Sequence, residues 1–311
     1  MKSKNVLTTN YITMLLVLMS SIIPFHASAD ELRYKPFVLA EETTAIVPDT
    51  IAAVKKKLTK GGFVVVGEYS PYENTSVIIF SNDTLKTYAA KTDYGSFAAA
   101  MRVTITKVKD KVQISYSNPS YLANAYQLDN DLNSVSSALK STLGFVKAFG
   151  SAEGLTKDDL RNYQYKWLMP YFADRIELMT YPDQKIALAK VDEFLKSNNV
   201  GASKVYQIDM NGKKETVIGV ALQGTDDDDC SSDKYIMNYI DFAETKSTPH
   251  LPYEIVVADG TVYALAAEFR IAISFPDLSM MGSNSFASIM CAPGAISGAL
   301  AKAVGGTLED E

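Results

Sequence analysis

The sequence predicts an α+β protein with two similar domains, each an antiparallel sheet covered by amphipathic helices. Three observations support this prediction. Residues 101–117 alternate apolar and polar side chains, which is the period-two pattern of a β-hairpin. A weaker copy of this hairpin follows at residues 253–265. In both halves the elements around the hairpin come in the same order, as expected for an internal repeat.

The first 29 residues have the pattern of a secretory signal peptide. Lys2 and Lys4 make the start basic, and residues 11–23 form an apolar run that is short for a membrane span. Ala27-Ser28-Ala29 supplies the small residues of a cleavage site. A single N-terminal membrane anchor is the alternative. We therefore expect a periplasmic or secreted protein, with no stable membrane span once the signal is removed.

The rest of the chain is long enough for two domains. We expect a first α+β repeat at residues 30–150, an aromatic connector at residues 151–172, and a second, diverged repeat at residues 173–311. Large rings crowd the connector, among them the only tryptophan, Trp167. We interpret them as packed between the two sheets, so that Trp167 fluorescence would report on the interface. An aromatic platform for a ligand is the alternative.

In the first repeat, residues 37–43 are expected to form a strand. A helix then starts at Val47-Pro48-Asp49, with proline in its first turn, and stops at Gly61-Gly62. Strands at residues 63–68 and 76–80, the hairpin and a closing helix at residues 135–144 complete the repeat. The hairpin has one apolar and one polar face, so we expect its sheet to bury one side only.

The second repeat follows the same plan. A strand at residues 175–180 precedes a helix that starts at Tyr181-Pro182-Asp183 and ends at Asn198-Asn199. Strands at residues 205–209 and 215–221 follow. Asp259-Gly260 joins the second hairpin, because this dipeptide suits a tight turn whose central residues both need positive φ. The closing helix at residues 296–305 aligns without gaps on residues 135–144.

Three segments of the first repeat carry a resemblance to a known family. They are residues 77–82 (VIIFSN), 102–105 (RVTI) and 112–122 (VQISYSNPSYL). In these segments the chain resembles the bacterial family catalogued as domain of unknown function 302, and we interpret its two repeats as a tandem duplication of that domain. The resemblance implies small α+β domains and no established reaction. The second repeat departs from it, since Phe275-Pro276-Asp277 takes the place of the Asn118-Pro119 corner and an acidic loop is added.

Composition excludes one class of partner. The 311-residue chain has a formal net charge of −6 and lacks a basic stripe, which argues against nucleic acid. Phosphate-binding loops precede helices, whereas Gly61-Gly62 and Gly305-Gly306 follow them.

Few residues could carry chemistry. Cys230 and Cys291 are the only cysteines, and in an exported chain they are expected to form a disulfide. His250 is the only histidine left after export, so every serine or cysteine nucleophile scheme must use it as the base. The alternative for His250 is a solvated or capping side chain. We assign no catalytic residue, and counting excludes a zinc site with several histidines.

Two further segments carry side chains that metals bind. Met280-Met281 and Met290-Cys291 could join His250 in a soft site for Cu(I) or haem, and core packing by methionine is the alternative. The run from Asp226 to Asp229 is interpreted as a solvated loop, with a weak calcium site as the alternative. We assign no metal and no cofactor.

The sequence therefore predicts a non-enzymatic module that binds a small molecule or a protein partner, with a site on the sheet faces or in the cleft between the repeats. The candidate ligand-binding residues are Asn118, Tyr121, His250, Met280 and Met281. The alternative is a periplasmic enzyme or a soft-metal or haem protein that uses His250 and residues 280–291.

Overall fold

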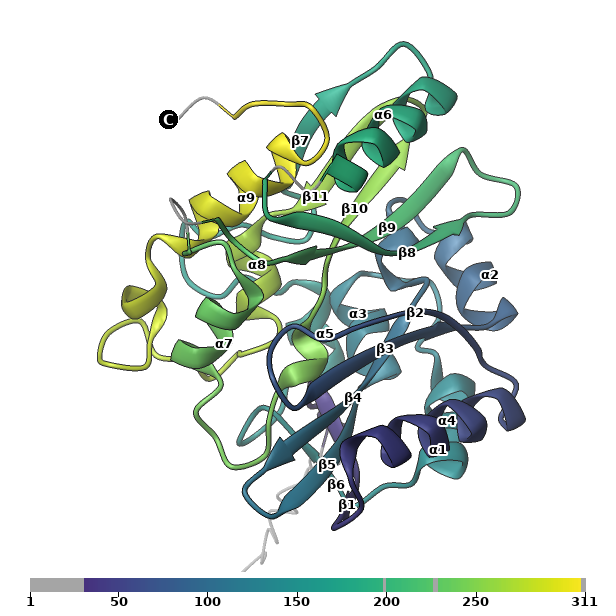
Figure 1. Cartoon of the computed structure of the whole chain (residues 1–311), viewed down its shortest axis with the longest axis vertical. Coiled ribbons are helices and arrows are strands. Elements are labelled where there is room, and N and C mark those ends of the chain that lie inside the picture. The colour runs from purple at the N-terminus through teal and green to yellow at the C-terminus, as the bar shows by residue number, and fades with distance from the viewer. Residues whose placement is uncertain (1–30, 198–199, 226–228, 309–311) are drawn as a thin grey trace, which may run out of the picture. The chain divides into compact units, whose positions relative to one another are not determined.

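A computed structural model describes residues 31–197, 200–225 and 229–308. The expected signal peptide and Asp226–Asp228 of the acidic run lie outside the described residues. From Leu32 onward the chain forms one compact unit that contains two antiparallel sheets (Figure 1). In the described part of the chain, no helix is both long and apolar enough to cross a membrane. The α+β prediction is confirmed.

The first sheet has the strand order β2-β3-β4-β5-β1-β6, with antiparallel neighbours. Its strands are β1 (Phe37–Thr43), β2 (Val64–Tyr69), β3 (Thr75–Ser81), β4 (Met101–Val108), β5 (Lys111–Ser117) and β6 (Lys147–Phe149). Helices α1 (Val47–Lys60) and α4 (Asn133–Leu143) pack against this sheet and against each other. Val54 and Leu58 of α1 are fully buried there. The first half also holds α2 (Asp83–Lys91), η1 (Gly95–Ala98), α3 (Pro119–Ala125) and α5 (Lys157–Arg161).

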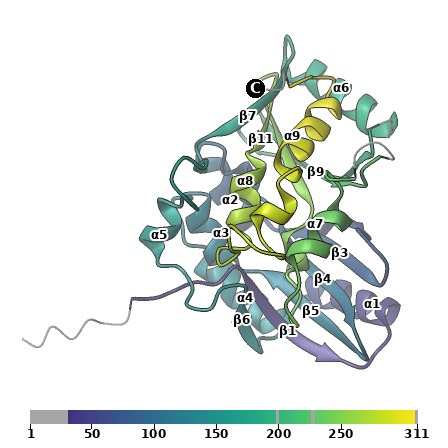
Figure 2. The same ribbon diagram turned by 90° about the vertical axis from the view of Figure 1, so that its left-hand side faces the viewer.

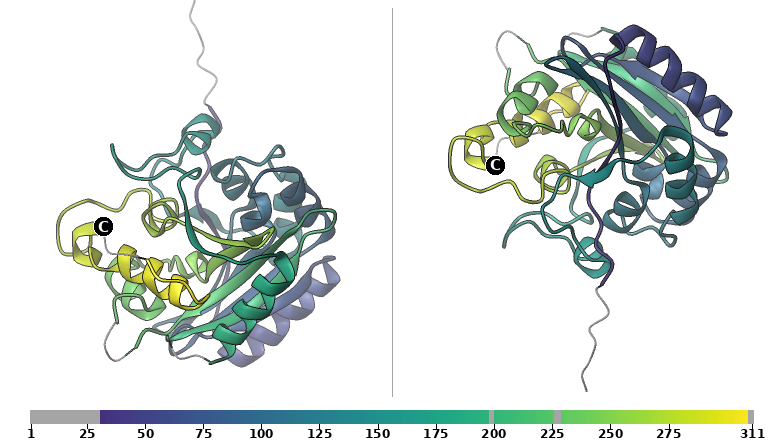
Figure 3. Two further views of the ribbon diagram at one scale, coloured as in Figure 1. Left: turned by 90° about the horizontal axis from the view of Figure 1, so that it is seen from above. Right: turned by 90° about the horizontal axis from the view of Figure 1, so that it is seen from below.

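The second sheet has the order β7-β11-β10-β9-β8, again antiparallel throughout. Its strands are β7 (Arg175–Thr180), β8 (Ala202–Asp209), β9 (Glu215–Leu222), β10 (Tyr253–Ala258) and β11 (Thr261–Leu265). Helices α6 (Gln184–Ser197) and α9 (Ala292–Lys302) pack against it. The remaining helices are α7 (Asp233–Ile240), η2 (Thr248–His250), α8 (Ala267–Ala272) and η3 (Phe286–Ile289). Figure 2 shows α9 beside α8, and Figure 3 shows α1 and α6 on the same side of the molecule.

The two sheets share one topology. Five strands of the first sheet run in the order β2-β3-β4-β5-β1, and the second sheet has the same order when β7 is counted as its first strand. Register shifts also fall at matching places, at Ala40 in β1 and Leu178 in β7, and at Val66 in β2 and Val205 in β8. The tandem duplication itself stays a prediction.

The expectation that the first sheet buries only one side is wrong. Its polar face is also buried, because η2 and neighbouring segments of the second half lie against it. The buried polar side chains are Arg102, Thr104 and Thr106 of β4 and Gln113, Ser115 and Ser117 of β5. Thr106 and Thr248 hydroxyls, for example, lie 3.1 Å apart across the junction. The alternating pattern thus correctly separated polar from apolar side chains. The polar side chains are buried because the second half of the chain packs against them.

The connector also differs from its prediction. Tyr163 and Phe172 are buried, but Trp167 is 84% exposed and Leu168 is 77% exposed. A turn closed by the Met169 N–H and the Lys166 carbonyl (2.9 Å) turns these two side chains outward. The interpretation of Trp167 as an interface residue is therefore wrong.

Candidate functional site

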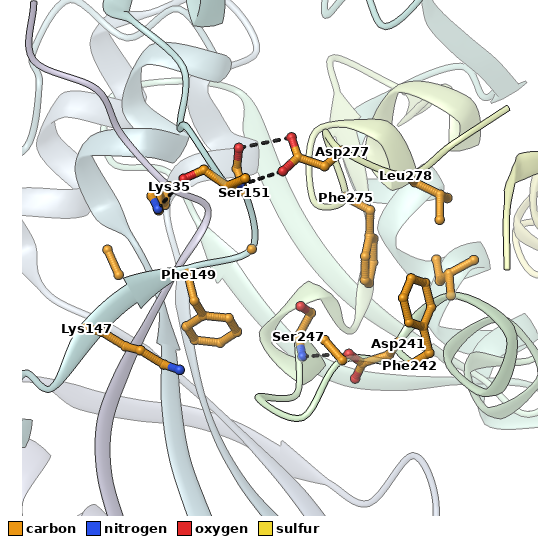
Figure 4. A pocket seen from close by; sticks show the side chains of 15 residues that line it. Lys35, Lys147, Phe149, Ser151, Asp241, Phe242, Ser247, Phe275, Asp277 and Leu278 are labelled. Atoms are coloured by element: carbon orange, nitrogen blue, oxygen red, sulfur yellow. Dashed lines mark hydrogen bonds between the residues drawn. The ribbon is translucent and has the colours of Figure 1, made fainter.

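A cavity of about 390 Å³ opens between the two halves (Figure 4). From the first half it is lined by Lys35, by β6 and by the segment that follows β6, residues 150–152. From the second half it is lined by residues 240–243 at the end of α7, by Ser247, and by Phe275, Asp277 and Leu278 after α8. Chain segments distant in sequence therefore meet at this one place.

Strand β6 supplies the first wall. It pairs with β1 on one side only, as the edge strand of the first sheet. The Phe149 ring packs against Phe37, with ring centroids 5.6 Å apart. Gly150 then turns the chain with φ of 96°, and a Cβ there would lie 2.9 Å from the Phe37 ring. A glycine is required at this position because both the conformation and the close approach disfavour a side chain.

Three phenylalanines give the cavity its apolar lining. Phe149 and Phe275 are 9% and 8% exposed, whereas Phe242 is 63% exposed at the rim. Figure 4 shows Phe149 and Lys147 on one wall and Phe242, Phe275 and Asp241 facing them. A pocket with apolar walls and few polar groups is the usual form of a small-molecule site.

Some charged groups at the cavity are already engaged. The Asp277 carboxylate accepts hydrogen bonds from the Ser151 hydroxyl at 3.0 Å and the Ala152 N–H at 2.5 Å. The Lys35 ammonium donates to the Ala152 carbonyl at 2.7 Å. These bonds tie the segment after β6 to the segment after α8, so they fix the upper edge of the cavity shown in Figure 4.

Asp241 is the buried acid of the cavity. It ends α7, is 6% exposed, and accepts a hydrogen bond from the Ser247 N–H at 2.9 Å. Lys246 donates to its main-chain carbonyl at 2.7 Å, and in the described part of the chain no ion pair reaches its carboxyl. Burial raises the pKa of Asp241 to about 7, against the opposing effects of the Ser247 hydrogen bond and the Lys246 charge.

His250 lies behind the cavity wall. It is 1% exposed, and its ring is 5.4 Å from the ring of Phe275, centroid to centroid. Arg270 Nη1 lies 3.0 Å from Nδ1, and the Tyr253 hydroxyl lies 3.1 Å from Nε2. Since arginine only donates, Nδ1 accepts and Nε2 carries the proton. Burial, with Arg270 and Arg102 nearby, holds the pKa of His250 well below its ordinary value, so the ring is neutral and both nitrogens are engaged.

A buried network of charges surrounds His250. Glu254 of β10 forms ion pairs with Arg102 of β4 and with Arg270 of α8, the latter at 3.3 Å from Nε to Oε2. Arg270 also donates to the His250 carbonyl. All four side chains are less than 5% exposed. Sequence reasoning missed this network, although the signal was present as a charged residue at the second position of each of two strands, Arg102 in β4 and Glu254 in β10.

The other candidate residues have separate surroundings. Asn118 donates to the Lys35 carbonyl at 2.9 Å, and the buried Tyr121 hydroxyl donates to the Ile273 carbonyl at 2.8 Å. Asn118 and Tyr121 therefore hold α3 to the start of β1 and to the end of α8. Met280 and Met281 are 41% and 77% exposed. Their exposure contrasts with the burial of His250, whose ring nitrogens bond to Arg270 and Tyr253.

The predicted disulfide is confirmed. Cys230 and Cys291 are joined, and the bond ties the segment before α7 to the start of α9. Cys291 is therefore not a free thiolate. Within the described residues, no group of three or more His, Cys, Asp or Glu side chains is placed to hold a metal ion.

Comparison with protein-family models, curated proteins and solved structures found no match. The resemblance to the domain of unknown function 302 family stays a prediction.

Proposed function

We propose that this chain is a non-enzymatic binding module that holds a small organic molecule in the cavity between its halves. The observation that carries this proposal is the cavity itself, to which both halves contribute and which combines three phenylalanine rings with one buried carboxyl. Its volume of about 390 Å³ lies within the range usual for small-molecule sites.

The surroundings of the cavity favour a preformed site. Arg102 and Glu254 connect the two sheets by a buried ion pair, and Asp277 connects the segments on either side of the cavity. Walls held in this way lose little conformational freedom when a ligand binds, which favours affinity.

We further infer that the protein is exported and acts in an oxidising compartment. The leader pattern at residues 1–29 and the Cys230–Cys291 disulfide support this inference. The tandem duplication is part of the same proposal, because equal strand order and matching register shifts are expected of two copies of one domain.

The alternative function is an enzyme or a soft-metal or haem protein built on His250 and residues 280–291. Two observations count against those particular residues. Both ring nitrogens of His250 are engaged in buried contacts, and Cys291 is in a disulfide. Such an activity would need other groups or a rearrangement of the second half.

Native mass spectrometry of protein purified without denaturation tests the proposal. A ligand of a few hundred daltons should appear as extra mass that is lost on denaturation, either as purified or after incubation with small amines, alcohols and acids. Phe242→Ala should lower its occupancy without unfolding the protein, because Phe242 is 63% exposed. Tyr239→Ala is the matched control, since Tyr239 is 40% exposed on the preceding helix and does not line the cavity. Bare mass under all these conditions would contradict the proposal.

A further inference from the structure

We propose that the cavity selects an organic ammonium ion, a small amine or quaternary ammonium compound with an apolar body. This inference rests on the proposed function and specifies the chemistry of the ligand. Three features of the cavity carry it: a buried carboxyl without an ion pair, aromatic walls, and lysines whose charges are exposed or already engaged.

The first feature is the carboxyl of Asp241. It is 6% exposed and, in the part of the chain that the structure describes, its only hydrogen-bond donor is the Ser247 N–H. An ionised carboxylate that is buried without a cation is strongly disfavoured, so such groups either bind a cation or stay protonated. A ligand ammonium in the cavity would supply the missing positive charge.

The second feature is the aromatic lining. The rings of Phe149, Phe242 and Phe275 border the cavity on both walls (Figure 4). The face of an aromatic ring carries partial negative charge and attracts cations, and sites lined by aromatic rings recognise quaternary ammonium groups in other proteins. Phe242 is exposed at the rim, where its ring is accessible to a ligand.

The third feature is that the negative charge of Asp241 dominates over the positive charges of the two lysines at the cavity. Lys35 and Lys147 also line the cavity and would repel a cation. The Lys35 ammonium is already bound to the Ala152 carbonyl, and the Lys147 side chain is exposed, so water and salt screen its charge. The field of the buried Asp241 carboxylate is screened much less. The Asp277 carboxylate at the rim is also exposed and already accepts hydrogen bonds from Ser151 and Ala152, so its charge is screened in the same way.

Two further groups face Asp241 from the other side. Lys246 bonds to the main-chain carbonyl of Asp241, and its charge favours ionisation of the carboxyl. Burial raises the pKa of Tyr72, so that Tyr72 stays neutral and adds no charge. Binding of a cation should therefore be coupled to loss of the Asp241 proton and should strengthen as the pH rises through about 7.

Three probes with the same benzyl group test this inference: benzyltrimethylammonium, benzyl alcohol and phenylacetate. Their dissociation constants would be measured by calorimetry or NMR titration at pH 8. The cation should bind about tenfold more tightly than the alcohol, and phenylacetate should bind most weakly. Asp241→Asn should abolish the advantage of the cation and leave the affinity for benzyl alcohol unchanged. Lys147→Gln, the matched control, should not weaken cation binding.

A measurement on the unchanged protein keeps the test valid if Asp241→Asn does not fold. Between pH 6 and pH 8 the affinity for benzyltrimethylammonium should rise about tenfold, while that for benzyl alcohol stays constant. Equal binding of all three probes, or a preference for phenylacetate that Lys147→Gln removes, would overturn the ammonium inference and leave the binding module intact. Binding of none of the probes would overturn the ammonium inference and count equally against the proposed function.

Discussion

Two acidic side chains buried at the junction of the halves have opposite surroundings. Glu254 is paired with Arg102 and Arg270, so its charge is compensated. The Asp241 carboxyl accepts one hydrogen bond, from the Ser247 N–H, and, among the described residues, forms no ion pair. The same kind of group therefore serves two purposes in this molecule. A compensated charge holds the halves together, and an uncompensated one beside a cavity is available to a ligand.

Breaking the buried Arg102–Glu254 ion pair should have the largest effect on stability. Arg102→Met leaves Glu254 with one partner in a buried site, and should lower the free energy of unfolding by about 3–5 kcal/mol. Urea unfolding of the variant would measure this loss. The double variant Arg102→Met/Glu254→Met should recover part of it. Lys111→Met is the control, because the Lys111–Glu42 pair is largely exposed and should contribute less than about 1 kcal/mol. Equal losses at Arg102 and Lys111 would refute the distinction.

The uncompensated Asp241 carboxyl should make the free energy of unfolding depend on pH. The pKa of Asp241 rises from 3.8 to about 7 on folding, so the folded state holds its proton more tightly. Its stabilising effect is present below pH 3.8 and is lost as the pH rises to about 7. The loss is about 4 kcal/mol at 1.36 kcal/mol per pKa unit. The free energy of unfolding, measured at pH 5 and at pH 8, should therefore fall less between these two pH values for Asp241→Asn than for the unchanged protein.

Asp233 makes the same measurement more informative. It is buried at the start of α7, accepts a hydrogen bond from Tyr69 at 2.9 Å, and burial raises its pKa to about 7. Asp233→Asn should reduce the decline by a similar amount. If neither variant changes the fall in the free energy of unfolding between pH 5 and pH 8, other groups are responsible for that fall.

Two phenylalanines of the cavity, Phe149 in its wall and Phe242 at its rim, should differ in how much they contribute to stability. Phe149→Ala removes a ring that is packed on Phe37 and should lower the free energy of unfolding by about 3 kcal/mol. Phe242→Ala should cost less than about 0.5 kcal/mol, since its ring is mostly exposed. Thermal unfolding of the two variants would measure the difference. Similar losses would show that Phe242 is part of the packed core.

The smallest effect is expected at the connector. Trp167 is 84% exposed, so its emission should be that of an indole in water, and Trp167→Ala should change the free energy of unfolding by less than about 0.5 kcal/mol. Addition of benzyltrimethylammonium should leave the emission unchanged. A blue-shifted emission would place Trp167 in a contact that this structure lacks.

Local signals predicted much of the fold. As expected, helix α1 has Pro48 in its first turn and ends just before Gly61. Asp259-Gly260 forms the hairpin turn, with φ of 47° at Asp259 and 100° at Gly260. These features depend on a few neighbouring residues. The disulfide followed from counting cysteines. Helix α2 was missed, although Asn82 caps it by accepting from the Leu85 N–H at 2.8 Å.

The site could not be predicted from such signals. Strand β6 has three residues, and residues 240–243 have no periodic pattern, so neither segment points to a cavity. Arg102 and Glu254 are 152 positions apart, and only the packing of the two halves brings them together. Periodicity predicts which face of a strand is apolar, whereas the partner of a polar face is a tertiary property.

The most direct test maps benzyltrimethylammonium on the ¹⁵N-labelled protein by NMR at pH 8. We predict shift changes confined to the residues that line the cavity, namely Lys35, residues 147–152, residues 240–243, Ser247, Phe275, Asp277 and Leu278, and weaker changes in Phe242→Ala. Changes confined to the exposed turn at Trp167, or no changes at all, would contradict this prediction.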